Sequence, residues 1–441
     1  MTDGASEPEP NNSKCLVEKL LRSCPDIGHV YILLRPKRGA DIEQRLEALV
    51  QGELFARLRQ QPNGAQLLAK LKPVRGDITE RLFGLAARDL QLLAARVSVV
   101  FHSAATVKFA EPLGVAVSNN VLSVAHLLEL AQRLARLQAL VHVSTAYSNC
   151  DRARVDEVLY EAPVRAQQLL ELAGCMEART LERIAPALLA GRPNTYTFTK
   201  AVAEALLVER ARALIPRVPL ALVRPSIVAG TWQQPLRGWV DNFNGPTGVI
   251  VAMATGALQA MPAEPSYCAD IVPVDVVANL LICSAFKVAL ARAEPSQQVS
   301  IFNCASSSLN PVHWRDIVRC VRATSERFPM NRPVREPGFK LIANRHLFAL
   351  FDLLGHRCAA QLGDLWLRLQ GAKPQLVALA SRLDKVVATL RPFTTRQWLF
   401  ECRNVTELYQ SLSRADQRLF NFDVRQVQWD DYISRYYIGS K

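Results

Sequence analysis

Tyr196 and Lys200 are the residues of this sequence whose types and spacing most directly suggest chemistry. They stand four residues apart in NTYTFTKAVAEA, at the start of a predicted helix, so both side chains are expected on one face of that helix. A nearby ammonium group lowers the pKa of a phenol from its ordinary value of about 10. Tyr196 is therefore predicted to donate a proton to a carbonyl oxygen, or to accept one in the reverse direction. Taken alone, the pair fits two unrelated surface side chains better.

Two hydroxyl residues, Ser144 and Thr145, directly follow a predicted strand in HVSTAYS. Open α/β sheets bind their ligands at the carboxyl ends of the strands, so a hydroxyl there could donate to a carbonyl group beside Tyr196. The alternative is that the residue only caps the next helix. The sequence does not decide which of the two hydroxyls would act.

Two further strand ends carry residues suited to a nucleotide cofactor. FHSAATVKF closes a strand with Ser103, Ala104 and Ala105, small residues that let a cofactor approach the backbone. GDI closes another with Asp77, which is placed to meet an adenine amino group. Each segment also fits an ordinary turn after a strand, but their order along the chain is hard to obtain by chance.

Arg35 follows the predicted strand HVYILL, with Lys37 and Arg38 close behind it. A carboxylate at this place would bind a ribose 2′-hydroxyl and favour NAD, whereas a guanidinium suits a 2′-phosphate. The sequence therefore predicts NADPH as the cofactor. The alternative is a solvated basic turn.

The elements that position these residues alternate between short apolar strands and helices. This alternation predicts an α/β fold with a Rossmann-like, doubly wound parallel sheet covered by helices on both faces. Helices are predicted in VLSVAHLLELAQRLARL and TFTKAVAEALLVERARAL. The predicted strands lie within residues 29–34, 71–77, 96–105, 139–147, 219–228 and 299–306.

Four parts of the chain are expected. Residues 1–13 are polar and rich in Pro and Asn, which predicts disorder. Residues 14–325 are predicted to form the NADP-binding domain, and the proline-rich residues 326–340 a linker. Residues 341–441 show no strand signal and are predicted to form a helical C-terminal domain.

Composition narrows the classes of partner. Lys and Arg outnumber Asp and Glu by 53 to 40, which favours anionic partners, but no basic run with interleaved aromatics points to nucleic acid. The ten cysteines show no C-x-x-C pair and no Cys/His cluster, so we expect reduced thiols and no metal, with Cys283 and Cys304 buried. No signal peptide is apparent.

Two apolar stretches are long enough to raise the question of a membrane span. Residues 244–263 are interrupted by Gly, Pro, Thr and Gln, which favours a buried helix or pocket wall over a membrane span. Residues 346–370 carry Asp352, His356 and Arg357 inside an apolar segment. That pattern fits a helix lying on or dipping into a membrane better than a clean span.

The ordered set of motifs resembles the extended short-chain dehydrogenase/reductases and, within them, the alcohol-forming fatty acyl-CoA reductases. The resemblance covers about residues 14–441 and includes the helical tail, where FTTRQWLFECRN and FNFDVRQVQWDDY match the family's C-terminal domain. The central motifs that carry it are LVEKLLRSCPDIGHVYILLRPKRG, FHSAATVKF, HVSTAYSN, YTFTKAVAE, VRPSIV and ADIVPVDVVAN.

This resemblance implies reduction of a long-chain acyl-CoA to a primary alcohol with two equivalents of NADPH. It makes Tyr196 and Lys200 the catalytic pair, with Ser144 or Thr145 as the third member. It also implies an intracellular protein at a membrane, of the peroxisome or the endoplasmic reticulum. The cofactor contacts that it implies are Arg35, Asp77, Ile78, Ser103, Ala104, Ala105, Asn120, Tyr196, Lys200 and Pro225.

The sequence departs from the family at its front. EPEPNNS stands where a glycine-rich phosphate loop belongs, and no apolar strand precedes it. The first strand of a doubly wound sheet lies at its centre, so its absence should leave both neighbouring strands without a partner. Alternatives are another extended reductase, such as a sterol dehydrogenase or an epimerase, and a catalytically silent lipid-binding or membrane-associated protein.

Overall fold

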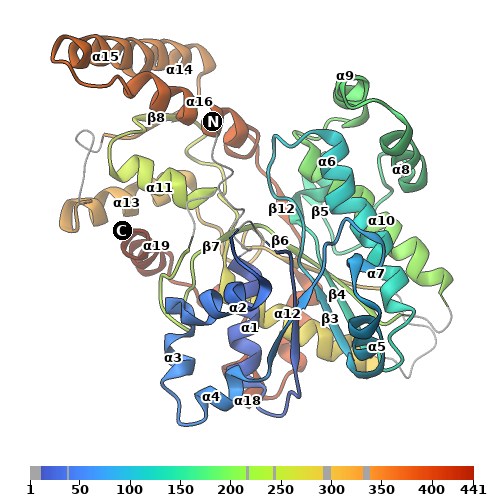
Figure 1. Cartoon of the computed structure of the whole chain (residues 1–441). Coiled ribbons are helices and arrows are strands. Elements are labelled where there is room, and N and C mark those ends of the chain that lie inside the picture. Colours follow the sequence, from blue (N-terminus) through green and yellow to red (C-terminus); the bar gives the residue numbers. More distant parts are fainter. Residues whose placement is uncertain (1–10, 37–38, 215–217, 242–244, 292–298, 331–337) are drawn as a thin grey trace.

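The computed structural model describes residues 11–36, 39–214, 218–241, 245–291, 299–330 and 338–441. Its parallel strands form the predicted doubly wound sheet in two separate pieces (Figure 1). Four strands run in the order β10-β6-β4-β3, and β1 pairs with β2 apart from them. The strands are β1 (Val30–Leu34), β2 (Leu71–Arg75), β3 (Val99–His102), β4 (Ala139–Val143), β6 (Leu220–Pro225) and β10 (Ser300–Cys304).

The two pieces separate where the first strand of a doubly wound sheet would lie. In that topology the chain's first strand sits between the second and the fourth, whose places β1 and β3 hold here. Among the described residues no strand lies between β1 and β3. Val99 of β3 is 38% exposed, whereas every residue of β4 is buried. Within the described residues, the facing edges of β1 and β3 therefore have no strand partner.

Helices cover both faces of the four-stranded piece because β4 is apolar on both sides. Its residues 139, 141 and 143 pack into one core with α1 (Asn11–Ser23) and α12 (Val274–Leu290). Leu140 packs on the opposite face with α7 (Ser123–Ala131) and α10 (Thr195–Ala213). A strand buried on both faces is typical of parallel sheets.

The remaining elements are short or lie at the periphery. The other helices are α2 (Ile42–Gln51), α3 (Ala56–Arg59), α4 (Gly64–Leu68), α5 (Ala87–Arg96), α6 (Leu113–Val117), α8 (Ala166–Cys175), α9 (Ala178–Leu188), α11 (Pro246–Ala254), α13 (Trp314–Arg327), α14 (Arg345–Phe351), α15 (Ala359–Leu369), α16 (Leu376–Thr394), α17 (Arg403–Ser411), α18 (Arg414–Leu419) and α19 (Trp429–Gly439). Turns of 3-10 or π type are η1 (Glu53–Phe55), η2 (Arg81–Gly84), η3 (Ser118–Leu122), η4 (Ala146–Asn149), η6 (Asp352–Cys358) and η7 (Val424–Gln426).

The C-terminal part contains strands that the sequence reading missed. β11 (Lys340–Ile342) pairs with β8 (Ala260–Pro262), and β12 (Leu399–Phe400) pairs with β5 (Arg154–Val155). A third short pair joins β7 (Ile227–Ala229) to β9 (Ile271–Pro273). Two- and three-residue strands give too short a period to be seen in sequence. The expectation of a tail without strands is therefore wrong at these two places.

The structure tests some of the predicted segment boundaries and buried residues. Helix α1 begins at Asn11, so residues 11–13 are helical rather than disordered, and residues 1–10 lie outside the described part. Most of the predicted linker, residues 331–337, also lies outside it. Within 244–263, α11 is largely buried, as predicted for that apolar stretch. Cys283 and Cys304 are buried, also as predicted.

By length and composition, one helical stretch of the described residues could cross a membrane. It runs through α6, η3 and α7, from Leu113 to Ala131, and 56% of its most apolar window is buried inside the molecule. A core helix of a globular protein passes the same test. This stretch contributes to the core beneath α10.

Hydrogen exchange should detect the opening in the sheet. We expect about half of the amides of β3 to exchange at nearly unprotected rates. Alternate N–H groups of a parallel strand point to each side, and one side of β3 has no strand partner within the described part of the chain. Amides of β6, which pairs on both sides, should exchange slowest and serve as the control. The measurement is exchange resolved to single strands by mass spectrometry. Protection of β1 and β3 equal to that of β6 would contradict an open sheet.

Candidate active site

Helix α10 positions the predicted catalytic pair. It starts at Thr195 because Asn194 caps it, with the Asn194 side chain accepting a hydrogen bond of 2.9 Å from the backbone N–H of Thr197. Tyr196 is half-buried and Lys200 is buried. The Lys200 ammonium donates to the carbonyl oxygen of Val143, at 2.8 Å, where β4 ends. The structure thus brings α10 to the carboxyl edge of the sheet.

The pKa of Tyr196 corrects the expectation from sequence. Burial raises it to about 12, and a hydrogen bond with the Thr145 side chain opposes that rise. Lys200 does not lower it, since its ammonium is held at the Val143 carbonyl. Burial also lowers the pKa of Lys200 to about 8, against the opposing charge of Glu204. In the protein alone, Tyr196 is therefore a protonated phenol.

The two hydroxyls after β4 lie in different environments. Thr145 caps η4, as the alternative reading supposed, and its Oγ1 accepts from the N–H of Tyr147 at 3.3 Å. The same side chain reaches Tyr196. The Ser144 hydroxyl is buried and has no hydrogen-bond partner among the described residues. An unpaired buried hydroxyl costs about 1–3 kcal/mol, which makes Ser144 the more available donor for a bound group.

Arg35 and Asp77, both predicted to contact the cofactor, contact each other. Their side chains form an ion pair of 3.3 Å, and Arg35 is more than half exposed. Burial acts to raise the pKa of Asp77, but hydrogen bonds from the backbone and hydroxyl of Thr79, together with Arg35, hold it below its ordinary value. Lys37 and Arg38 lie outside the described residues.

Other predicted contacts line the same edge of the sheet. Ser103, Ala104 and Ala105 directly follow β3 and are partly exposed, and Pro225 is the last residue of β6. Ile78 lies beyond β2, where its carbonyl faces the His126 imidazole at 3.3 Å. The edge is thus assembled from the ends of both pieces of the sheet.

Asn120 ties the loop after β3 to α10. It lies on the π-helical turn η3, and its side-chain oxygen accepts from the N–H of Thr106 at 3.0 Å. Its amide N–H donates to the Thr199 hydroxyl, also at 3.0 Å. These bonds occupy the Asn120 side chain, so here it positions the loop, and its predicted contact to a cofactor stays a prediction.

An aromatic wall beside Tyr196 was not predicted from sequence. Phe109 lies 5.6 Å from the Tyr196 ring, between ring centroids, and Phe393 of α16 stacks on Phe109 at 5.4 Å. Tyr147 meets Phe393 edge to face at 5.0 Å. Sequence reasoning missed this wall because Phe393 comes from a helix almost 200 residues beyond Tyr196. The wall gives the phenol an apolar neighbour suited to an apolar substrate.

A buried ion pair stabilises the position of α10 at this edge of the sheet. Arg224 is fully buried, and its guanidinium donates to both carboxylate oxygens of Glu204, at 3.0 and 2.7 Å. Glu204 also accepts from the Ser148 hydroxyl at 3.0 Å. Because Glu204 stands one helical turn after Lys200, this network fixes α10 against the ends of β4 and β6.

Two buried histidines lie beneath Lys200. His102 and His142 are register partners on β3 and β4, with Nδ1 atoms 2.8 Å apart. Burial, with the Lys200 charge, lowers the pKa of His102 to about 3 and that of His142 well below its ordinary value. Both imidazoles are therefore neutral at physiological pH. Their matching places just before two strand ends, in FHS and HVS, are the signal that could have found them.

Comparison with known proteins assigns the family. Residues 13–281 match an NAD-binding family model described as male sterility protein, and residues 355–441 match a second model with that description. Fatty acyl-CoA reductase 1 of Gallus gallus is 38% identical over 429 residues, covering 97% of this chain and 81% of the relative. The chain belongs to the fatty acyl-CoA reductase family. Fatty acyl-CoA reductase 2 of Homo sapiens is 37% identical with the same coverage.

Solved structures agree with this family at the level of the fold. The terminal R domain of the myxalamid PKS-NRPS pathway superposes on 97% of the reductase-family chain with a TM-score of 0.61 at 19% identity, and 87% of that domain is covered. A reductase domain of a nonribosomal peptide synthetase from Mycobacterium tuberculosis gives 0.58 at 19% identity, covering 97% and 88% of the two chains. The fold is that of Rossmann-like reductases.

The histidine pair should make stability depend on pH. Unfolded histidines bind protons below about pH 6.5, whereas the buried pair does not, so stability present above that pH is lost as the pH falls towards 3, by up to about 1.4 kcal/mol per unit for each histidine. We expect His102→Phe/His142→Phe to flatten this loss between about pH 6.5 and 5. Urea unfolding at a series of pH values measures it.

His29→Phe, at an exposed histidine, is the control and should keep the wild-type slope. Burial raises the pKa of Glu157 to about 7, so its effect on stability between about pH 6.5 and 5 is opposite to that of the histidines. Glu157 is present in all three proteins, so its effect cancels when their slopes are compared. Equal slopes for the double variant and the wild type would contradict neutral buried histidines.

Proposed function

We propose that this chain carries the catalytic residues of an NADPH-dependent reductase that converts long-chain acyl-CoA to primary alcohol. The observation that carries the proposal is the hydrogen bond between the Tyr196 phenol and the Thr145 side chain, just after β4. The neighbouring Ser144 has a buried hydroxyl that is unpaired among the described residues. Membership in the fatty acyl-CoA reductase family supports the substrate class. The aromatic wall of Phe109 and Phe393 is consistent with an apolar acyl chain.

The residues of the chain would act on the carbonyl oxygen of the substrate. Tyr196 keeps its proton at neutral pH, because its pKa is about 12, and is placed to donate it as negative charge develops on that oxygen. Ser144 has a free hydroxyl with which to orient the same oxygen, while Thr145 holds the phenol. Lys200 would exchange its bond to Val143 for a ribose hydroxyl. A nicotinamide cofactor at this edge supplies the hydride.

The chain fits two ends of that cofactor but not its middle. Asp77 and the residues after β3 suit the adenine end, and Tyr196 with Lys200 suits the nicotinamide end. Ahead of Lys14, the sequence has EPEPNNS in place of a glycine-rich loop for the pyrophosphate. Each lost backbone hydrogen bond to a charged oxygen forfeits about 1.5–3 kcal/mol, at 1.4 kcal/mol per tenfold in affinity. We infer that the 441-residue chain by itself binds NADPH poorly.

The first prediction concerns the missing strand. Replacing residues 1–13 by an apolar strand and a glycine-rich loop should restore both NADPH binding and turnover of a long-chain acyl-CoA, because the graft pairs β1 with β3 and supplies the pyrophosphate site. The unmodified chain, homogeneous by intact mass, should show little or no turnover in the same assay. Comparable rates for the two would contradict the proposed cause of inactivity. A graft that binds NADPH but never turns over would instead support a silent lipid-binding protein.

The second prediction tests the proton donor in the active, grafted protein. Tyr196→Phe should lower turnover by about 10²-fold or more while leaving acyl-CoA binding nearly unchanged, since only the acidic hydroxyl is lost. Tyr409→Phe, at a tyrosine of α17 whose hydroxyl donates to the backbone carbonyl of Gln417, is the matched control. Retention of more than about a tenth of the turnover would remove Tyr196 from this role.

Arg35 should set the preference between the two nicotinamide cofactors. Arg35→Asp in the grafted protein replaces a partner of the 2′-phosphate by a repelling carboxylate, so NADPH should weaken far more than NADH. Fluorescence titration gives both dissociation constants. Arg57→Asp, at an exposed basic position on α3, is the control and should change the ratio little. An unchanged ratio for Arg35→Asp would place Arg35 outside the cofactor site.

A further inference from the structure

The hairpin formed by α14, η6, α15 and α16, residues 345–394, is here called the arm. It extends from the body of the molecule at the upper left of Figure 1. It exposes many leucines while it buries the carboxylates of Asp352 and Asp364. The helices of globular proteins usually bury their leucines and expose their carboxylates.

The arm exposes many large apolar side chains. Leu362, Trp366 and Leu369 are 67%, 61% and 79% exposed, and they recur at the helical spacing of one face of α15. Contiguous exposed apolar surface on this scale marks a binding surface. The other strongly exposed apolar residues of the arm are Leu347, Leu350, Leu353, Leu354, Leu365, Val377, Leu379 and Val386.

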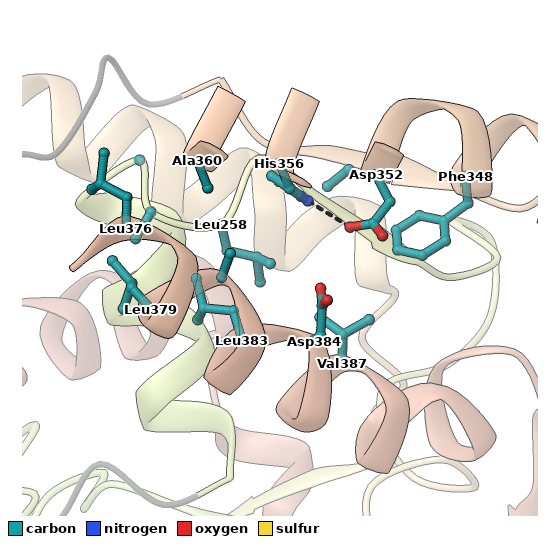
Figure 2. Close-up of a pocket in the computed structure, with 14 residues that line it drawn as sticks. Leu258, Phe348, Asp352, His356, Ala360, Leu376, Leu379, Leu383, Asp384 and Val387 are labelled. Atoms are coloured by element: carbon teal, nitrogen blue, oxygen red, sulfur yellow. Dashed lines mark hydrogen bonds and ion pairs between the residues drawn. The ribbon is translucent and has the colours of Figure 1, made fainter. Parts of the chain in front are cut away.

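The inner face holds the acidic side chains of the arm, each with partners. Buried Asp352 accepts from His356 at 3.0 Å and from Arg357 at 2.9 Å, beside a cavity of about 160 Å³ (Figure 2). Arg357 also reaches Asp384 on α16, at 3.3 Å. Buried Asp364 accepts from the first backbone N–H groups of α16, at 2.9–3.0 Å. Ionisable groups turned inwards and paired are what an apolar surrounding requires.

We propose that the arm docks on a lipid bilayer with anionic headgroups. Residues 341–396 contain eight Arg and Lys against three Asp, and all three Asp are engaged inside the arm. Arg368, Lys373, Arg382 and Lys385 are exposed, so the arm presents cations together with leucines. Exposed Trp366 fits the headgroup level, where tryptophan concentrates. An element that inserts leucines at the boundary of the acyl chains and places cations beside lipid phosphates is an interfacial membrane-binding element.

Docking would place the candidate site beside the bilayer. Helix α16 runs from the arm to Phe393, whose ring stacks on Phe109 next to Tyr196. Delivery of a lipid-chain substrate along this helix rests on the proposed function, whereas docking itself does not. Vesicle binding therefore tests the arm independently of turnover.

The test is co-sedimentation of the full chain with vesicles of phosphatidylcholine containing about 30 mol% phosphatidylserine, and with pure phosphatidylcholine. We expect binding to the first to be at least about tenfold stronger. The variant Leu362→Glu/Trp366→Glu/Leu369→Glu should lose at least about tenfold in binding to both. A control with equal charge places glutamates at exposed apolar positions elsewhere, Phe286, Leu290 and Ile438, and should bind like the wild type.

A second variant tests the contribution of the cations to vesicle binding separately from that of the leucines. Arg382→Glu/Lys385→Glu should weaken binding to the anionic vesicles and leave binding to pure phosphatidylcholine unchanged. Thermal melts and gel filtration of every protein accompany the assay. Wild-type protein that stays in the supernatant, or an arm variant that binds as well as its control, would overturn the proposal. So would a wild-type dimer that the arm variant converts to monomers without any change in sedimentation.

Discussion

The structure depends on one requirement, that every backbone N–H and C=O of a buried strand finds a partner. The four-stranded piece meets it at β4 and β6, which pair on both sides and are buried along their whole length. β1 and β3 meet it on one side only, because nothing among the described residues pairs with their facing edges. Each of these two strands is therefore an edge placed in the middle of a sheet, and both are partly exposed.

The contacts that hold the candidate catalytic residues in place do not cross the gap between β1 and β3. Lys200 is held by Val143, Asn120 bridges Thr106 and Thr199, and Arg224 meets Glu204. All of these contacts join the four-stranded piece to the helices that cover it. The cofactor, in contrast, would span the opening, with its adenine end at Asp77 and its nicotinamide end at Tyr196. We therefore propose that the opening falls between the two halves of one binding site.

The sequence predicted what depends on local pattern. All six principal strands and both quoted helices follow from apolar periodicity. The aromatic wall depends on side chains distant in sequence, which periodicity does not reveal. The pKa of Tyr196 was predicted in the wrong direction because spacing on a helix says nothing of burial, and burial outweighs a neighbour that donates elsewhere.

The central claim is that the unmodified chain holds both ends of NADPH but not its pyrophosphate. Calorimetric titration of that chain with 2′-AMP and with 2′-phospho-ADP-ribose, which adds the pyrophosphate and a second ribose but no nicotinamide, tests it most directly. The account predicts affinities within about a hundredfold of each other, since no backbone N–H groups bind the additional phosphates. Binding of 2′-phospho-ADP-ribose tighter than that of 2′-AMP by more than about a hundredfold would show that the pyrophosphate is held and would contradict the account.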